Sequence, residues 1–125
     1  MSTKKDKFSS KDKKYMKIAI DLAKARKGLT GENPSVGCVI VKNDKILSIG
    51  QTGYNGRPHA ETNAINNSFQ NLSGSKMYVT LEPCNHYGKT PPCTKSIINS
   101  GIKELFYSIN DIDKKVKGKS FKILT

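Results

Sequence analysis

The chain has 125 residues, of which 35% are hydrophobic and 26% charged, a size and composition typical of one compact domain with a single core. Its apolar runs, such as Val39-Ile40-Val41, are far shorter than the roughly 18 residues of a membrane span, which argues against a membrane protein. The Lys- and Ser-rich N-terminus lacks the apolar core of a secretory signal, so we expect a cytoplasmic protein.

The net charge of +12 admits nucleic acid, an anionic membrane or an anionic small molecule as a partner. The lysines are spread along the chain, with local excess over 4–14 and 114–122, and aromatic residues make up only 7%. This pattern shows no base-stacking surface, so it favours a solvated basic surface over nucleic-acid binding.

The first expected element is a helix that begins near Ser10, interpreted as an N-cap, and ends before Gly28, interpreted as the C′ residue. Its apolar residues recur at helical spacing: Tyr15, Ile18, Ala19, Leu22 and Ala23. Residues 1–9 are polar and charged, so we expect a disordered basic tail before a domain that spans 10–125.

The later elements alternate between extended and helical patterns. We predict a β-hairpin over 36–42 and 46–51, a helix over 58–69, a strand over 77–81, a helix over 92–100 and a strand over 102–109. Strands that are joined through helices usually run parallel, whereas hairpin strands run antiparallel. The sequence therefore predicts an α/β fold with a mixed sheet flanked by helices, and a site beyond the carboxyl ends of its strands.

Two motifs contain residues suited to a metal. Pro58-His59-Ala60-Glu61 stands at an expected helix start, and Pro83-Cys84 is followed after eight residues by Cys93. Zinc deaminases share the pattern H-x-E…P-C-x-x-C, in which His and both Cys hold the metal and Glu moves protons. We therefore predict a Zn²⁺ site formed by His59, Cys84 and Cys93, with the fourth position left to water.

The proposed ligand set requires a neighbouring base. Two thiolates and one neutral imidazole cancel the charge of Zn²⁺, so the bound water is acidified less than in an all-histidine site. Glu61 lies two residues after His59, at the first helical turn, and we predict that it is the general acid/base.

Other interpretations of these residues remain open. The cysteines and histidine would form a structural zinc site if a fourth ligand closed it, and His86 is the only other histidine. Unrelated roles for the three residues are the second alternative. Cys38 lies in a buried-strand pattern and is interpreted as a core residue.

Longer stretches carry a family resemblance. The runs Gly37-Cys38-Val39-Ile40-Val41, Pro58 to Glu61, and Val79-Thr80-Leu81-Glu82-Pro83-Cys84 through Gly88-Lys89-Thr90-Pro91-Pro92-Cys93 resemble the deaminase domain of the bifunctional riboflavin-biosynthesis deaminase/reductase. Most relatives in the cytidine-deaminase-like superfamily carry P-C-x-x-C instead. The resemblance runs from about Tyr15 onward. It implies a three-layer α/β/α fold and hydrolysis of the 2-amino group of 2,5-diamino-6-ribosylamino-4(3H)-pyrimidinone 5′-phosphate.

The resemblance also implies roles for single residues. Besides the zinc ligands and Glu61, the matching positions are Asn33 for the base and His86 and Lys89 for the ribose phosphate; each could equally be a solvated loop residue. Lys89 suits a phosphate because its ammonium is a compact charge. Thr52 stands where many family members have a histidine.

The family's reductase domain is absent from these residues, so the resemblance admits a separate reductase as a partner, and the sequence is compatible with a homo-oligomer. The alternative enzyme is a nucleoside or tRNA deaminase, which the basic charge suits and the cysteine spacing opposes. The alternative without catalysis is a zinc-stabilised RNA-binding module.

Overall fold

The computed structural model describes residues 2–5, 8–81 and 93–107. In chain order the elements are β1 (Ser2–Lys5), α1 (Ser10–Ala25), β2 (Gly37–Lys42), β3 (Lys45–Gln51), the 3₁₀ turn η1 (Tyr54–Gly56), α2 (Ala60–Asn67), β4 (Lys76–Val79), α3 (Cys93–Asn99) and β5 (Glu104–Tyr107). Within these ranges no helix has both the length and the hydrophobicity of a membrane span.

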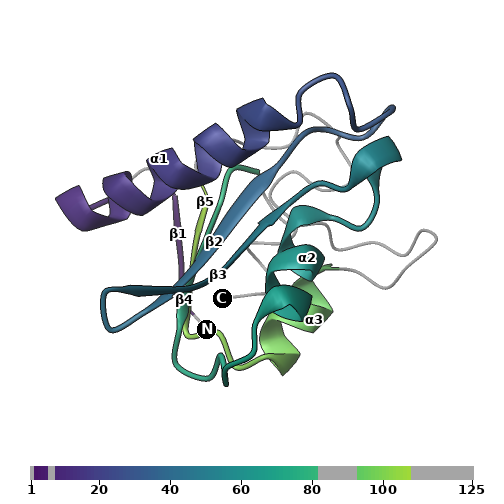
Figure 1. Ribbon diagram of the computed structural model, residues 1–125. Helices are drawn as coiled ribbons and strands as arrows, with labels where there is room; N and C mark the ends of the chain where they lie inside the picture. Colours follow the sequence, from purple (N-terminus) through teal and green to yellow (C-terminus); the bar gives the residue numbers. More distant parts are fainter. Residues whose placement is uncertain (1, 6–7, 82–92, 108–125) are drawn as a thin grey trace.

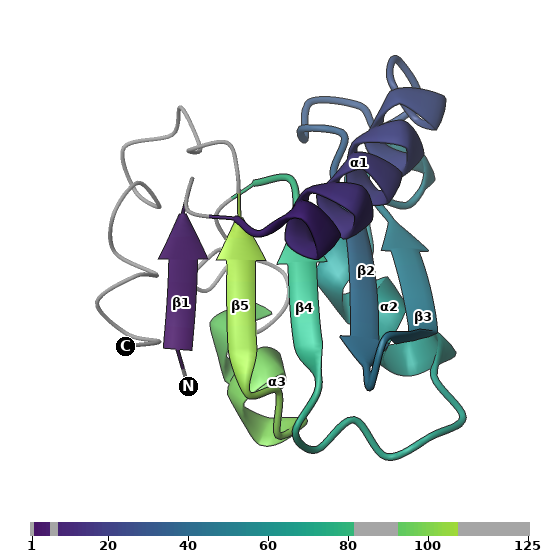
Figure 2. The same cartoon turned by 90° about the vertical axis from the view of Figure 1, so that its left-hand side faces the viewer.

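The strands form one five-stranded mixed sheet in the order β1-β5-β4-β2-β3 (Figure 2). β2 is antiparallel to both β3 and β4, and β5 is parallel to its neighbours β4 and β1. α1 covers one face of the sheet, while α2 and α3 lie side by side on the other (Figures 1 and 2). The three-layer α/β/α fold with a central mixed sheet is confirmed.

β1 is a strand within the segment 1–9, for which a disordered tail was expected, so the expectation is wrong at residues 2–5. Ser2–Lys5 pairs with β5 in parallel register, from Ser2 opposite Glu104 to Lys5 opposite Tyr107. Backbone N–H and C=O groups form such a ladder whatever the side chains are. The sequence pattern did not predict this strand, because the segment has low hydrophobicity and its partner lies about 100 residues away in the sequence.

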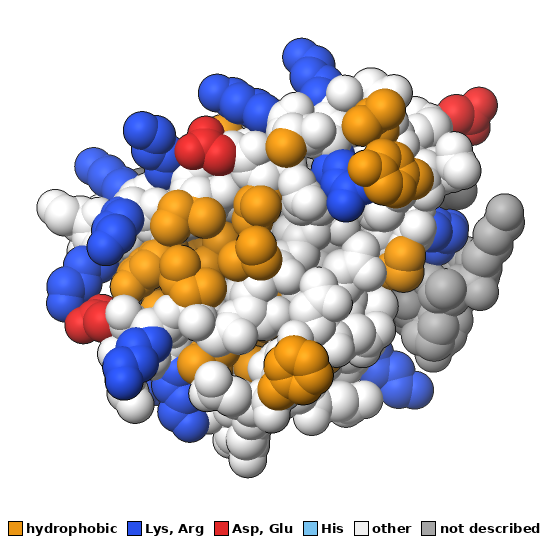
Figure 3. Space-filling view, viewed as in Figure 1, with side chains coloured by type: hydrophobic (Ala, Val, Ile, Leu, Met, Phe, Trp, Pro, Cys, Tyr) orange, Lys and Arg blue, Asp and Glu red, His pale blue; other side chains and the backbone are white. Residues whose placement is uncertain are grey.

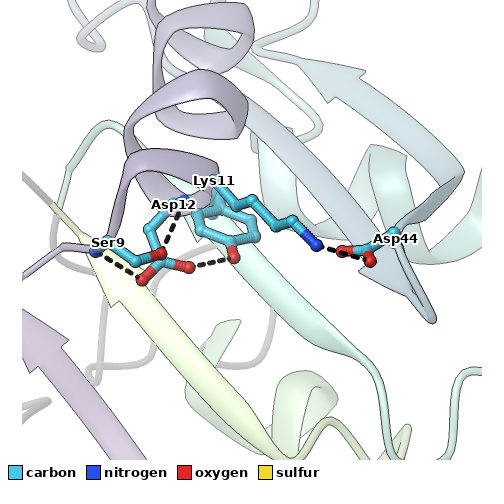
Figure 4. Close-up of polar contacts among 5 residues, drawn as sticks. Ser9, Lys11, Asp12 and Asp44 are labelled. Atoms are coloured by element: carbon cyan, nitrogen blue, oxygen red, sulfur yellow. Dashed lines mark hydrogen bonds and ion pairs between the residues drawn. The ribbon is translucent and has the colours of Figure 1, made fainter.

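α1 begins with a capping box, one residue earlier than predicted. Ser9, not Ser10, is the N-cap: its hydroxyl accepts a hydrogen bond from the Asp12 N–H at 3.2 Å, and the Asp12 carboxylate accepts one from the Ser9 N–H at 3.0 Å (Figure 4). The reciprocal bonds satisfy two donors that a helix start leaves unpaired. α1 ends at Ala25, and Gly28 follows in a left-handed conformation with φ +86°.

Each face of the sheet has its own core. Under α1, the buried side chains come from the helix and the central strands: Tyr15, Met16, Ala19, Val39, Val41, Tyr78 and Phe106. Under α2 and α3 the core includes Cys38, whose side chain is fully buried, as predicted. The alternation of β2 between these two cores explains why its apolar run is continuous.

The predicted hairpin is confirmed, and the later elements are present but shorter than predicted. Asn43 and Asp44 join β2 to β3 with φ values of +52° and +60°, as a two-residue hairpin turn requires. The expected helix over 58–69 is Ala60–Asn67, because the backbone is still extended at His59. Residues 108 and 109 of the last expected strand lie outside the described residues.

Candidate functional site

The strand directions bring three chain segments to one edge of the sheet, the edge formed by the carboxyl ends of β3 and β4. β3 and β4 both run antiparallel to β2, so their carboxyl ends lie at the same edge as the start of β2. α2 follows β3, α3 follows β4, and the loop that contains Asn33 precedes β2. The predicted site residues His59, Glu61, Cys93 and Asn33 therefore belong to segments that meet at this edge, where open α/β sheets bind ligands.

The H-x-E motif lies at the first turn of α2. His59 is the N-cap, with extended backbone angles of φ −66° and ψ 157°, and its imidazole does not cap the helix. Glu61 is already helical, and its side chain is only 5% exposed. Residues two apart point to different sides within a regular helix, so the extended geometry at His59 is what allows both side chains to serve one site.

The Asn63 side chain forms hydrogen bonds to the backbone just before this turn, and the sequence pattern did not predict this role. Its Nδ2 donates to the Gln51 carbonyl at 2.7 Å and to the Pro58 carbonyl at 3.2 Å, and its N–H donates to the His59 carbonyl at 3.0 Å. The side chain thus connects the end of β3 to the start of α2. Only its short distance from the motif would have marked it in the sequence.

The Asn33 side chain has one orientation. Its Nδ2 donates to the Gly56 carbonyl at 3.0 Å. Its backbone is held by Thr30: the Asn33 N–H donates to the Thr30 carbonyl at 3.2 Å, and the Asn33 carbonyl accepts from the Thr30 hydroxyl at 2.6 Å. A carbonyl only accepts, so the amide nitrogen must face Gly56. The remaining Asn33 group, Oδ1, is a hydrogen-bond acceptor.

Cys38 is poorly suited to bind zinc. Burial raises the pKa of the Cys38 thiol well above its ordinary value, and the negative charge of the Glu61 carboxylate raises it further. Zinc binds the thiolate form. Cys38 therefore remains a protonated core residue close to Glu61, and the zinc prediction depends on the other two cysteines.

The remaining predicted residues are only partly covered by the structure. Cys93 is the first residue of α3, while Cys84, His86 and Lys89 lie outside the described residues. Among the described residues no group of three His, Cys, Asp or Glu could hold a metal, as expected when Cys84 is not among them. The donor set still suits zinc, since an imidazole at one helix start and a cysteine at the next stand at the same sheet edge.

Basic side chains do not gather on the face that Figure 3 shows. Most Lys and Arg side chains in this view lie toward its margin, more of them on the left, and an apolar patch lies within the face.

Comparison with known proteins identifies the family. The model of the cytidine and deoxycytidylate deaminase zinc-binding region matches residues 9–109. The diaminohydroxyphosphoribosylamino-pyrimidine deaminase of Buchnera aphidicola subsp. Schizaphis graminum is 51% identical over 109 residues, which cover 87% of this chain and 74% of that protein. The riboflavin biosynthesis protein RibD of Aquifex aeolicus is 49% identical over 108 residues, which cover 86% of this chain and 30% of that protein.

A solved structure agrees with these relatives. The crystal structure of a diaminohydroxyphosphoribosylaminopyrimidine deaminase/5-amino-6-(5-phosphoribosylamino)uracil reductase from Thermotoga maritima superposes with a TM-score of 0.86 at 42% identity, covering 91% of this chain and 33% of that one. The chain thus spans about a third of the length of the Aquifex and Thermotoga proteins. These matches, together with the motif geometry, show that the chain belongs to the cytidine and deoxycytidylate deaminase zinc-binding family and, within it, to the group of diaminohydroxyphosphoribosylaminopyrimidine deaminases.

Proposed function

We propose that this chain is the zinc-dependent deaminase of riboflavin biosynthesis, which hydrolyses the 2-amino group of 2,5-diamino-6-ribosylamino-4(3H)-pyrimidinone 5′-phosphate. The observation that carries the proposal is the H-x-E turn at the start of α2, with Glu61 buried at the sheet edge where α3 begins with Cys93. The 51% identity to a deaminase named for this substrate class supports the same assignment.

The proposed ligands of the zinc are His59, Cys84 and Cys93. Bound there, the metal supplies Lewis acidity that makes a water a better nucleophile. The Glu61 carboxylate takes one proton from the attacking water and gives it to the ring nitrogen, then takes the proton of the hydroxyl now on C2 and gives it to the departing amino group. A C–O bond forms at C2 as the C–N bond breaks, so the products are the pyrimidinedione and ammonia.

Substrate recognition is assigned to three further residues. Asn33 presents Oδ1, which accepts from an N–H of the pyrimidine, because its Nδ2 is bonded to Gly56. For His86 and Lys89 we propose contacts with the ribose phosphate, a role that suits the compact ammonium charge of Lys89.

Glu61→Gln tests the proton transfer. The variant should retain about one zinc per chain, because Glu61 is not a ligand. It should lose roughly 10²–10⁴-fold in turnover, the usual range for general acid–base catalysis. Asp21→Asn, which removes an exposed carboxylate on α1, is the matched control. The measurements are zinc content and ammonia release, and near-normal turnover in Glu61→Gln would identify another proton carrier.

Two comparisons in the same assay test the ligands and the substrate. Cys84→Ser and Cys93→Ser should lose most of the zinc, and full retention would reject the ligand assignment. The diaminopyrimidine phosphate should be deaminated faster than cytidine or tRNA. The reverse order would favour the nucleoside or tRNA deaminase alternative, and zinc binding without any ammonia release would favour the RNA-binding module.

A further inference from the structure

Thr52, directly after β3, lies at the edge of the sheet that carries the site and is buried, with 1% of its surface exposed. Its hydroxyl oxygen accepts a hydrogen bond from the Val36 N–H at 2.8 Å and donates to the Pro34 carbonyl at 3.2 Å. Its own N–H donates to the Val36 carbonyl at 3.0 Å. Three bonds therefore join Thr52 to the segment that follows Asn33.

The Thr52 hydroxyl has partners for its hydrogen and for one lone pair. Its one hydrogen is directed to the Pro34 carbonyl at 3.2 Å, with the Val36 carbonyl at 3.5 Å as a second acceptor, and its oxygen accepts the N–H of Val36, which is itself buried. Without the hydroxyl, that N–H would be a buried donor lacking a partner. A side chain with this burial and these bonds is not placed to contact a substrate.

The loop that begins at Thr52 holds Asn33 from two sides. On one side, Thr52 bonds to Pro34, the residue next to Asn33. On the other side, the Gly56 carbonyl accepts from Asn33 Nδ2, and a Cβ added at Gly56 would lie only 2.4 Å from that nitrogen. The position of Asn33 Oδ1 thus depends on contacts at both ends of the 52–56 loop.

We propose that Thr52 is a positioning residue of the active site, which fixes the backbone next to Asn33 and so aims Asn33 Oδ1 at the substrate without touching it. The proposal rests on the substrate role assigned to Asn33 above.

The test compares Thr52→Val, which keeps the shape but removes the hydroxyl, with Thr52→Ser, which keeps the hydroxyl. Thr52→Val should lower kcat/KM for the diaminopyrimidine phosphate about tenfold, the factor expected for one well-made hydrogen bond, with zinc content unchanged. Thr52→Ser should stay within about twofold of wild type. Ser75→Ala, which removes another buried hydroxyl bonded to a backbone carbonyl, is the matched control and should not change kcat/KM.

A double-mutant cycle separates positioning from general stability. In an Asn33→Ala background, Thr52→Val should cause no further loss in kcat/KM, because the group that it positions is gone. A full additional loss, or a Thr52→Ser variant as impaired as Thr52→Val, would overturn the proposal. If Thr52→Val does not fold, Thr52→Ala also removes the hydroxyl and replaces it in the cycle.

Amide hydrogen exchange tests the same contact without an assay. The Val36 N–H should be protected in wild type and in Thr52→Ser and should exchange faster in Thr52→Val, while amides of β4 stay unchanged. Equal protection of Val36 in all variants would contradict the proposed contact. If wild type releases no ammonia from any substrate, the proposed function fails, whereas the exchange result still decides whether Thr52 holds the loop.

Discussion

Asp12 connects the start of α1 to the sheet. Its carboxylate accepts a hydrogen bond from the Tyr78 hydroxyl at 2.6 Å and from the Ser9 N–H at 3.0 Å (Figure 4). Burial by itself raises the pKa of Asp12, but the bonds from Tyr78 and Ser9 outweigh it, so the pKa lies below the ordinary value of 3.8. Burial and the neighbouring Asp12 raise the pKa of Tyr78. The pair thus remains a neutral hydroxyl that donates to a carboxylate.

Asp12→Asn should lower the free energy of unfolding by about 1 kcal/mol at pH 7, because it weakens the capping box and the bond from Tyr78. A depressed pKa stabilises the folded protein above the unfolded value and stops doing so as the pH falls through the folded value. The difference from wild type should therefore shrink below about pH 4. Urea unfolding at pH 7 and pH 3 measures it, and an equal difference at both values would contradict this account.

Two glycines let the helices approach the sheet from opposite sides. A Cβ at Gly37 would lie 1.8 Å from the Ala19 carbonyl oxygen of α1, and a Cβ at Gly50 would lie 2.3 Å from the Ala60 carbonyl oxygen of α2. Real side chains cannot approach backbone this closely, so each glycine sets a helix-to-sheet distance. Because α2 begins at Ala60, the contact at Gly50 also sets the depth of Glu61.

Gly50→Ala should destabilise the fold by about 1–3 kcal/mol, the usual result of overpacking, and should lower turnover because α2 must move away from β3. Gly28→Ala is the control. An alanine at the Gly28 φ of +86° should cost about 1 kcal/mol of stability, but its added Cβ would meet nothing within 4 Å. Thermal unfolding and ammonia release distinguish the two variants. Wild-type turnover in a destabilised Gly50→Ala protein would show that Glu61 does not depend on this contact.

At the scale of the whole molecule, the described residues form one sheet with one core on each face. The deaminase family model matches residues 9–109, whereas the Thermotoga deaminase/reductase is about three times as long as its matched part. The described residues thus lie mostly within the deaminase match, and their strands all belong to one sheet.

We predict that these 125 residues release ammonia from the diaminopyrimidine phosphate and leave NADPH unconsumed. The deaminated ribosylamino product should accumulate until a separate reductase is added. Product analysis together with absorbance of NADPH measures both activities in one reaction. Substrate-dependent NADPH oxidation by this chain alone would show that reduction shares the deaminase fold.

The features that the sequence by itself determined are those with local patterns. Helical spacing predicted α1, turn residues predicted the hairpin, and the two-residue spacing of His59 and Glu61 required a helix start, which the structure has. The family followed from motifs that are contiguous in the sequence. The roles of all seven predicted site residues stay predictions, and three of them, Cys84, His86 and Lys89, also lie outside the described residues.

Only the tertiary structure decided the features that depend on partners far away in the sequence. β1 exists through backbone bonds to β5, the Asn33 amide is oriented by Gly56, and Thr52 is directed to Val36 and Pro34, 16 and 18 residues earlier. Hydrogen bonds between distant segments impose no period on side-chain polarity, so pattern analysis cannot detect them. The same sequence that predicted the reacting residues was therefore silent about the residues that position them.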